Sequence, residues 1–487
     1  MSEKESVDTE TVVLSKEAEE AINYSYTEAE ERKVLRKLDL NVVSYVSSLY
    51  LLAFLDRGNI GNANTAGMSE DLGISDHQYQ WFLTIFYISY IIFEFCVLLW
   101  KIFPPRYYAP TMVISWGIVS TCCAAVVNWS GMMALRFFLG LFEAAFGPGV
   151  PYYLTFFYYR HEIAWRIGIF MSVAPIASAF SGALAYGITK HELAIESWRV
   201  LFLVEGLPTV FVGIIGYFCL PNGPKECYFL NEHEKNILIS RMAKQIGKTE
   251  RSHKMNWSEN AKAIIDPKNL FPMCMYFGIN VSFASLPVFL PAILKGMGYS
   301  SIDAQGLTAP PYIFTAIMDL LAAWFSDKIM QRGLCITALA STSAAGFLIL
   351  ALCSVTGVKY FAVFLAAGGI FPCVALTLSW LSNNQGSESK RGIGIVITML
   401  IGQCGPVLGT RIFPESEAPY YQKGFYISFA MSAMVAFCSI CLRIYLMFQN
   451  HKLDEKHGKI QDQTANLNSS DQTLSDGSEN PNFRYVL

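Results

Sequence analysis

The sequence predicts an all-α integral membrane protein with twelve transmembrane helices in two six-helix, pseudo-symmetric halves. The first indication is composition. Of the 487 residues, 53% are hydrophobic and only 15% are charged, and the mean hydropathy is +0.34, as is typical of a membrane protein. The second is a series of apolar windows of about 20 residues, the length that crosses a bilayer as a helix. The third is a polar stretch that divides these windows evenly.

Each predicted span is a continuous apolar run, which disfavours a β-barrel, because barrel strands show alternating patterns of about ten residues. The twelve spans, in order, cover residues 38–58, 79–100, 108–127, 131–157, 166–190, 200–220, 268–294, 304–326, 334–354, 358–381, 391–412 and 423–448.

Three polar segments complete the predicted organisation. Residues 1–37 lack the basic-then-apolar order of a cleavable signal peptide, and 449–487 are polar with few aromatic residues, so we expect two disordered cytosolic tails. Residues 221–267 form a predicted cytosolic loop between an N-terminal half, 38–220, and a C-terminal half, 268–448. Transporters built from two such halves place their site between them, near the bilayer midplane.

The loops on the two sides of the predicted membrane differ in charge. Lysine and arginine gather in every second loop, whereas the other loops carry fewer basic residues and more acidic ones, so the positive-inside rule predicts cytosolic termini. The basic residues of the predicted inner loops are Lys101, Arg106, Arg160, Arg166, Lys328, Arg332, Lys390 and Arg391.

Four charges lie within or at the end of predicted spans. Asp56 and Arg57 follow the apolar part of span 38–58, and span 131–157 contains Arg136 and Glu143. A charge at mid-bilayer depth is costly, so such a side chain is expected to face a cavity or a partner. Arg136 and Glu143 are seven residues apart, which places them on one helix face about 10 Å apart along the axis. We therefore expect two cations and two carboxylates to share a cavity.

The chemistry of these groups suits a carrier of anions. A guanidinium stays charged and holds a carboxylate through two parallel hydrogen bonds, so Arg57 is the predicted ligand of the substrate's anionic group. Asp56 and Glu143 can each gain or lose a proton, and a moving arginine contact can switch either acid between the two states.

Structural interpretations of the same residues remain open. Asp56 and Arg57 can instead form an interfacial ion pair at the end of a span, and Arg136 can snorkel to the outer surface. Glu143 fits a structural role less well, because it lies mid-span beside Gly and Ala with no adjacent charge. Glu94, also within a span, is expected either to pack or to act at an inner gate.

Five segments carry a resemblance to a known family: "LDRGNIGNA", "RFFLGLFEAAFGPGVPYYLTFFYYRHEIAWRIGIF", "SWRVLFLVEGLPTVFVGIIGYFCLPNGPKE", "GYSSIDAQGLTAPPYI" and "SWLSNNQGSESKRG". They resemble the major facilitator superfamily and, more narrowly, the fungal allantoate permease-like branch of its anion:cation symporter family. The resemblance covers residues 36–446. It implies the major facilitator fold and the import of small organic anions such as allantoate, nicotinate, pantothenate or biotin, usually with protons.

The resemblance also implies residue roles. Related bacterial sugar-acid carriers have an Asp-Arg pair in span one and an Arg and a Glu in span four, and four residues here match that pattern. By this resemblance Glu143 carries a proton with Asp56 as its partner, and Arg57 binds the anionic group of the substrate. Arg136 either sets the pKa of the acids or forms a gating ion pair.

A loop motif of the family, G-x-x-x-D-[RK]-x-G-R-[RK], is similar to "WFSDKIMQRG" after span eight, which makes Asp327 and Arg332 a candidate gating latch. In span eleven, Gln403 follows Gly402 where the family usually has Gly-Asn, which leaves the pocket shape and the substrate open. Asn59 is expected to line the outer entrance, and Tyr312 is either a packing aromatic or a ligand contact.

The predicted function is import of a carboxylate vitamin or nitrogen source with protons by alternating access, by a protein that is monomeric and needs no cofactor or metal. The alternative is a membrane nutrient sensor that does not transport. Neither a reactive constellation typical of an enzyme nor a basic balance typical of nucleic-acid binding is found, since the net charge is −3. The expected location is the plasma membrane, with the endoplasmic reticulum as the alternative.

Overall fold

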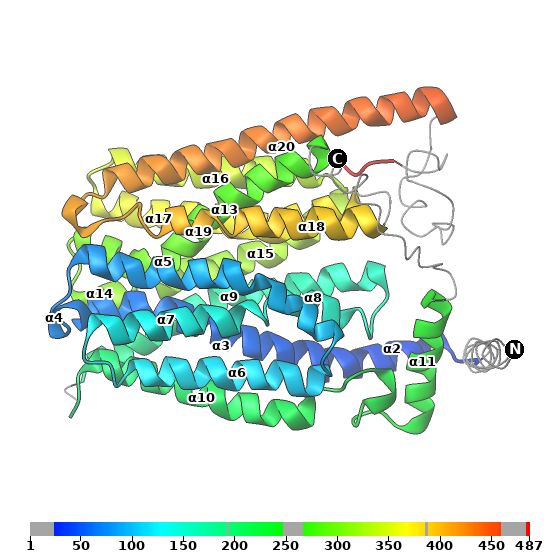
Figure 1. Cartoon of the computed structure of the whole chain (residues 1–487). Coiled ribbons are helices and arrows are strands. Elements are labelled where there is room, and N and C mark those ends of the chain that lie inside the picture. Colours follow the sequence, from blue (N-terminus) through cyan, green and yellow to red (C-terminus); the bar gives the residue numbers. More distant parts are fainter. Residues whose placement is uncertain (1–23, 192–193, 247–265, 385–387, 459–483) are drawn as a thin grey trace, which may run out of the picture.

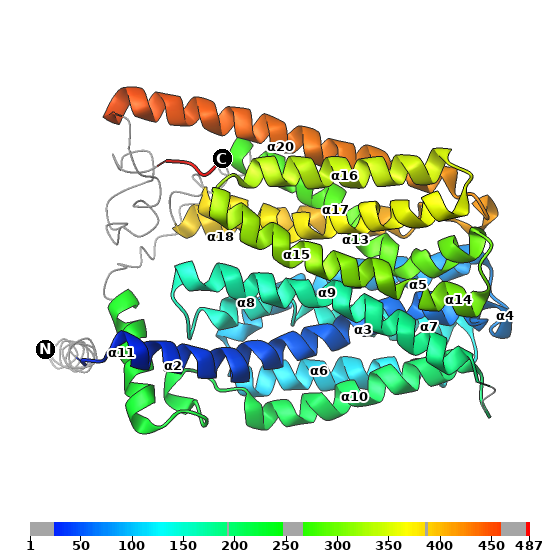
Figure 2. The same cartoon turned by 180° about the vertical axis from the view of Figure 1, so that it is seen from behind.

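The computed structural model describes residues 24–191, 194–246, 266–384, 388–458 and 484–487. Every regular element in these ranges is helical, which confirms the all-α prediction. Most of the long helices run side by side in one bundle, as Figures 1 and 2 show from opposite sides.

Seven of the described helices form the N-terminal half of the bundle, apart from one single-turn helix. They are α3 (Ser44–Thr65), α5 (Asp76–Phe93), α6 (Pro105–Cys123), α7 (Trp129–Ala144), α8 (Gly149–Leu154), α9 (Arg160–Thr189) and α10 (Ser197–Cys219). A single helical turn, α4 (Met68–Asp71), connects α3 to α5.

Eight of the described helices form the C-terminal half of the bundle. They are α13 (Pro267–Gly296), α14 (Ser301–Gly306), α15 (Ala309–Ile329), α16 (Arg332–Leu352), α17 (Thr356–Asn383), α18 (Glu388–Gly402), α19 (Gly405–Gly409) and α20 (Gln422–His457). In Figure 1 most of this half lies above the N-terminal half, and α14 lies level with α5 and α7.

Each of the twelve predicted spans corresponds to helix in the structure. Ten helical stretches of the described chain are long and apolar enough to cross a membrane, and they account for ten of the predicted spans. The span predicted at 108–127 is α6, and the span predicted at 391–412 is divided between α18 and α19. Large apolar side chains such as Phe211, Phe218 and Phe437 are exposed on the outside of the bundle, where lipid would cover them.

Two spans are broken near their middle. Between α7 and α8 the chain runs through Gly147 and Pro148, and between α18 and α19 it runs through Gln403 and Cys404, with Pro406 in the first turn of α19. Proline cannot donate its backbone nitrogen to a helical hydrogen bond, and glycine tolerates the change of direction. Such breaks are tolerated at membrane depth only where the backbone is buried in protein or lines a cavity.

Structured residues extend into the segments predicted as tails and loop. Helix α2 (Glu28–Leu38) occupies part of the predicted tail 1–37, because Thr27 and Glu30 form a capping box at its start. Helix α11 (Glu232–Ile246) lies in the predicted loop 221–267, and α20 continues to His457. Residues 1–23, 247–265 and 459–483 of the predicted tails and loop lie outside the described residues.

Helix α11 is attached to the N-terminal half by ion pairs. The buried Arg241 side chain binds Glu31 of α2 and Glu162 of α9 at 2.6 and 2.7 Å, and Glu234 binds Lys37 at 2.7 Å. Burial alone would raise the pKa of the Glu234 carboxyl, but the Lys37 ammonium and the Asn231 backbone amide lower that pKa below its ordinary value. Helices α2 and α11 and residues 484–487 all lie at one end of the bundle, here called the terminal end.

The buried apolar residues form two clusters. One belongs to the N-terminal half and reaches the terminal end through Val34, Leu38 and Leu238. The other fills the C-terminal half and continues into the N-terminal half at the opposite, far end, through residues such as Ile60 and Phe82. The two halves therefore share one apolar core at the far end of the bundle.

Candidate functional site

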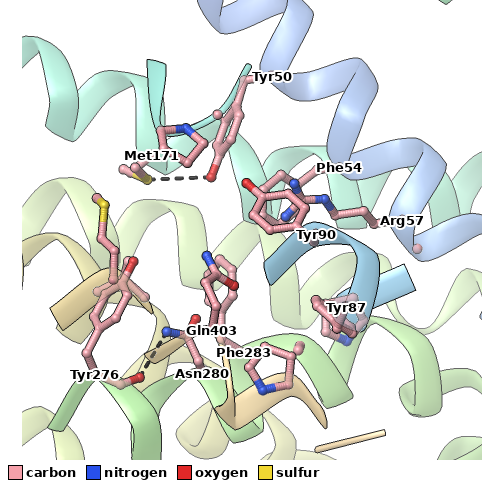
Figure 3. Close-up of a pocket in the computed structure, with 18 of the residues that line it drawn as sticks. Tyr50, Phe54, Arg57, Tyr87, Tyr90, Met171, Tyr276, Asn280, Phe283 and Gln403 are labelled. Atoms are coloured by element: carbon pink, nitrogen blue, oxygen red, sulfur yellow. Dashed lines mark hydrogen bonds between the residues drawn. The ribbon is translucent and has the colours of Figure 1, made fainter. Parts of the chain in front are cut away.

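A cavity lies between the two halves, near the middle of the bundle (Figure 3). Counted out to its open side, its empty volume is about 840 Å³. Both broken spans reach it, through Pro148 and Gln403. Its other lining residues come from α3, α5, α8, α9, α13, α17, α18 and α19, among them Tyr50, Phe54, Arg57, Tyr87, Tyr90, Met171, Tyr276, Asn280 and Phe283.

Hydrogen bonds between the halves close the far end of the bundle. Thr84 of α5 bonds to Thr410 at 3.1 Å and accepts from Arg411 at 3.0 Å. The Gln305 side chain donates to the backbone carbonyl of Asn62 at 3.2 Å. In both α3 and α5, the cavity residues lie nearer the terminal end than the residue that makes these contacts, Asn62 or Thr84. The structure is therefore a conformation closed at the far end.

Arg57 of α3 is the charged residue among the cavity's described lining residues. Its Nε atom donates to Glu143 Oε2 of α7 at 2.5 Å, and the Glu143 side chain is fully buried. The guanidinium lies over the rings of Phe54, Phe86 and Tyr90, with its central carbon 5.0 to 5.5 Å from each ring centroid. Cation–π contacts and one buried carboxylate thus hold this cation beside the cavity.

Asp56 does not pair with Arg57. Adjacent helical residues point about 100° apart, and Asp56 turns into the N-terminal half, where it accepts a hydrogen bond from Ser120 of α6. The interpretation of Asp56 and Arg57 as an interfacial ion pair is therefore wrong. The helix also continues past the predicted end of the span at residue 58 to Thr65, so both charges lie within it.

Asp56 belongs to a second buried polar cluster, away from the cavity. Arg136 of α7 is 2% exposed and lies close enough to Asp56 to interact with its charge. Glu205 of α10, also 2% exposed, interacts with both, and accepts from Ser181 of α9 at 3.1 Å. Snorkelling of Arg136 to the surface is thus excluded. Glu205 was missed in the sequence, although an isolated acid inside span 200–220 was the signal that pointed to it.

Of the other predicted substrate contacts, only Gln403 reaches the cavity. It lies at the break between α18 and α19. Asn59 is three residues from Asp56 and shares its face, so it is buried inside the N-terminal half instead of lining an outer entrance. Tyr312 is buried against Phe371, with ring centroids 5.8 Å apart. Arg136, Asn59 and Tyr312 therefore do not line the cavity in this conformation.

The predicted gating residues lie toward the terminal end. Arg332 Nη2 binds Asp327 Oδ1 at 2.7 Å across the turn between α15 and α16, so the expected ion pair is present. Glu94 follows the last residue of α5, at the start of a 3₁₀-helical stretch, Glu94–Lys101. It is half-buried, and one of its carboxyl oxygens lacks a hydrogen-bond partner in the described part of the chain.

The aromatic wall of the cavity was also missed. Tyr87 and Tyr90 are three residues apart on α5 and face the cavity together, and Tyr50 and Tyr276 join them from α3 and α13. The Asn280 side chain donates to the Tyr276 carbonyl at 2.9 Å. The spacing of Tyr87 and Tyr90 indicates a shared face, but a sequence does not show whether that face meets lipid or a cavity.

The chain is similar to known transporters over its whole length. Residues 46–410 match the Major Facilitator Superfamily. An uncharacterized transporter of Schizosaccharomyces pombe is 32% identical over 490 residues, covering 100% of this chain and 94% of that protein. A high-affinity nicotinic acid transporter of Saccharomyces cerevisiae is 31% identical over 462 residues, covering 94% and 85%.

Among solved structures, a bacterial homologue of the human lysosomal transporter Spinster, in an inward-facing and unoccupied conformation, is similar with a TM-score of 0.63. The sequence identity is 15%, and the match covers 87% of this chain and 99% of that one. At this identity the likeness shows the fold alone.

Proposed function

The chain belongs to the major facilitator superfamily and is a multi-pass membrane transporter, and from this premise we propose that it imports a small organic anion together with a proton. The observation that carries the proposal is the Arg57 guanidinium, which lies beside the central cavity and is paired with a buried acid of another helix. A fixed cation next to a cavity suits a carboxylate substrate.

The pairing of Arg57 with Glu143 couples anion binding to proton binding. With Glu143 ionised, the pair is neutral, and an entering carboxylate would add an uncompensated negative charge inside the bundle. If Glu143 takes up a proton, Arg57 is released to the substrate and the site stays neutral. Since uncompensated charge in the membrane interior is costly, one proton accompanies each substrate charge bound at Arg57.

The aromatic residues of the cavity favour a small, flat carboxylate. Tyr50, Tyr87, Tyr90 and Phe283 offer ring faces near Arg57, and Gln403 and Asn280 offer amides from the C-terminal half. The similar yeast protein is named a nicotinic acid transporter, and nicotinate has this form. Of the carboxylate vitamins and nitrogen sources that we propose as substrates, which include nicotinate, pantothenate and allantoate, the cavity therefore favours nicotinate.

Transport follows from two alternating states. In the state described, the far end is closed by Thr84, Thr410 and Arg411. Rocking of the halves would open this end and close the other, exposing Arg57 to each side in turn.

The remaining predicted site residues have supporting roles in this cycle. The Asp327–Arg332 pair and Glu94 are gating residues of the terminal end, and Arg136 compensates the charge of Asp56. Each pH unit across the membrane contributes about 1.4 kcal/mol per proton.

We further propose that the protein works in the plasma membrane as a monomer with both termini in the cytosol. The test is uptake of radiolabelled nicotinate, pantothenate, biotin and allantoate by cells that lack their own carriers, at acid and neutral external pH. Acid-stimulated accumulation of one compound is the expected result. With the protein at the cell surface, uptake of none of these anions would contradict the proposal and support the sensor alternative.

A further inference from the structure

Glu205 is a buried acid that the proposed exchange at Arg57 does not use. It lies within α10, and its carboxyl accepts a hydrogen bond from the Ser181 hydroxyl at 3.1 Å. The second oxygen, Oε2, is buried and lacks a hydrogen-bond partner in the described part of the chain. An ionised carboxylate in such a place is poorly solvated, whereas a neutral carboxylic acid is tolerated.

The helices packed against α10 supply few charges to Glu205. Asp56 of α3 is a like charge, and Arg136 of α7 is the cation near it. Helix α6 contributes the Ser120 hydroxyl, which is bonded to Asp56, and the buried thiol of Cys123, and α9 contributes Ser181. Glu205 and Asp56 therefore share one guanidinium.

The charges in this part of the bundle balance only if one of the three carboxyls carries a proton. The described residues of α3, α7 and α10 hold three buried carboxyls, Asp56, Glu143 and Glu205, and two guanidiniums, the buried Arg136 and Arg57, whose side chain is 16% exposed at the cavity. Arg57 is paired directly with Glu143. If Asp56 and Glu205 were both ionised, Arg136 would balance only one of them, and the cluster would keep a buried negative charge that is costly in the membrane interior.

A chain of hydrogen bonds connects Glu205 to the closed far end. Ser181 donates to Glu205 and accepts from the Asn62 side chain at 2.9 Å. The backbone carbonyl of Asn62 accepts from Gln305 of α14, in the other half, and Gln305 accepts from Thr189 at 2.8 Å. Beside Ser181, Gly182 packs so closely on Thr308 that a Cβ at this glycine would overlap the threonine side chain.

We propose that Glu205 is a second proton-binding group, protonated while the far end is closed, and that Ser181 and Asn62 link its charge to that closure. Closing the far end excludes water from the cluster and so favours neutral Glu205, whereas an open far end admits water and favours the ionised form. Binding of a proton at Glu205 therefore stabilises the closed far end. That this proton is needed for uptake rests on the proposed function, whereas the proton site itself does not.

The first experiment detects the proton directly. Infrared spectra of the whole protein in lipid nanodiscs at neutral pH contain the C=O stretch of protonated carboxylic acids. We expect Glu205→Gln to remove one component of this band, Glu205→Asp to shift it, and Glu70→Gln, at an exposed position, to leave it unchanged. A band that is identical in wild type, E205Q and E205D would overturn the proposal.

The second experiment tests the link to the far end. Hydrogen exchange of α14, corrected for the intrinsic effect of pH, should slow in the wild type as pH falls. Glu205→Gln should exchange slowly at every pH, and Ser181→Ala should keep the infrared band but lose the pH response. If exchange of α14 in both Glu205→Gln and Ser181→Ala slowed with falling pH as in the wild type, the proposed link between Glu205 and closure of the far end would be contradicted. Neither experiment uses a transported anion, so failure of the proposed function would leave both results interpretable.

Discussion

The Nε atom of Arg57 on α3 lies 2.5 Å from a carboxylate oxygen of Glu143 on α7, and the cavity between the halves opens beside it. Its chain neighbour Asp56 binds Ser120 in the interior of the N-terminal half. Two adjacent charges thus lie in different surroundings, one beside the cavity and one behind it, and Glu143 is close enough to interact with the charges of Asp56 and Arg136.

Replacing Arg57 by lysine tests the substrate clamp. Lysine keeps the positive charge but cannot hold a carboxylate through two parallel hydrogen bonds. We expect Arg57→Lys to lower kcat/KM for the anion by about tenfold, equivalent to about 1.4 kcal/mol. Initial rates of uptake, normalised to protein at the cell surface, measure the change. An unaltered kcat/KM would exclude Arg57 as the group that orients the substrate.

Closure of the far end depends on a close approach of α3 to α13. A Cβ at Gly61 would overlap the backbone carbonyl of Val288, whereas a Cβ at Gly187 would meet open space. We expect Gly61→Ala to disfavour the closed far end, so that anion binding persists but net uptake falls severalfold. Gly187→Ala is the matched control and should transport normally. Equal uptake by the two variants would show that this approach does not limit the cycle.

Gln403 should determine which anions fit. It lines the cavity from the break between α18 and α19, and asparagine would enlarge the cavity there by one methylene. We expect Gln403→Asn to favour bulkier carboxylates over smaller ones by several-fold, because such pocket changes are worth about 1–3 kcal/mol. Competition between labelled anions measures the ratio. If the wild type and Gln403→Asn preferred the same anions in the same order, residues other than Gln403 would determine the selectivity.

The attachment of α11 should weaken in acid. The pKa of Glu234 is lowered in the folded protein, so its ion pair with Lys37 contributes stability above the carboxyl's ordinary pKa. That stability is lost as pH falls through the lowered pKa. Hydrogen exchange of α11 should therefore rise at low pH in the wild type. In Lys37→Gln, hydrogen exchange of α11 should already be faster at neutral pH and should change less in acid. If the two proteins showed the same dependence of exchange on pH, the ion pair would not hold α11.

The helices of the bundle were predictable because membrane spans must be long, apolar and internally hydrogen-bonded. All twelve predicted spans correspond to helix, and the family suggested by the quoted segments is confirmed. The breaks at Pro148 and Gln403 shift the bounds, and the capping box at Thr27 and Glu30 adds a helix where composition indicated a tail.

The positions of the site residues were less predictable, because the sequence does not show how each helix is rotated. Arg57 and Gln403 do face the cavity, whereas Arg136, Asn59 and Tyr312 are buried elsewhere. A face toward the cavity and a face toward the interior of one half look alike in sequence, since both carry isolated polar residues among apolar ones. Glu205 was missed for the same reason: its hydrogen bond from Ser181 of α9, and the bond from Asn62 of α3 to Ser181, depend on how three helices are rotated.

The most direct test of the central claim is proton flux measured together with anion uptake in proteoliposomes that contain the purified protein. The account predicts that the transported carboxylate brings protons into the lumen, and that Glu143→Gln still exchanges labelled for unlabelled anion but no longer accumulates it when the outside is acid. Anion accumulation driven by the pH gradient to the same level in Glu143→Gln and wild type would contradict it.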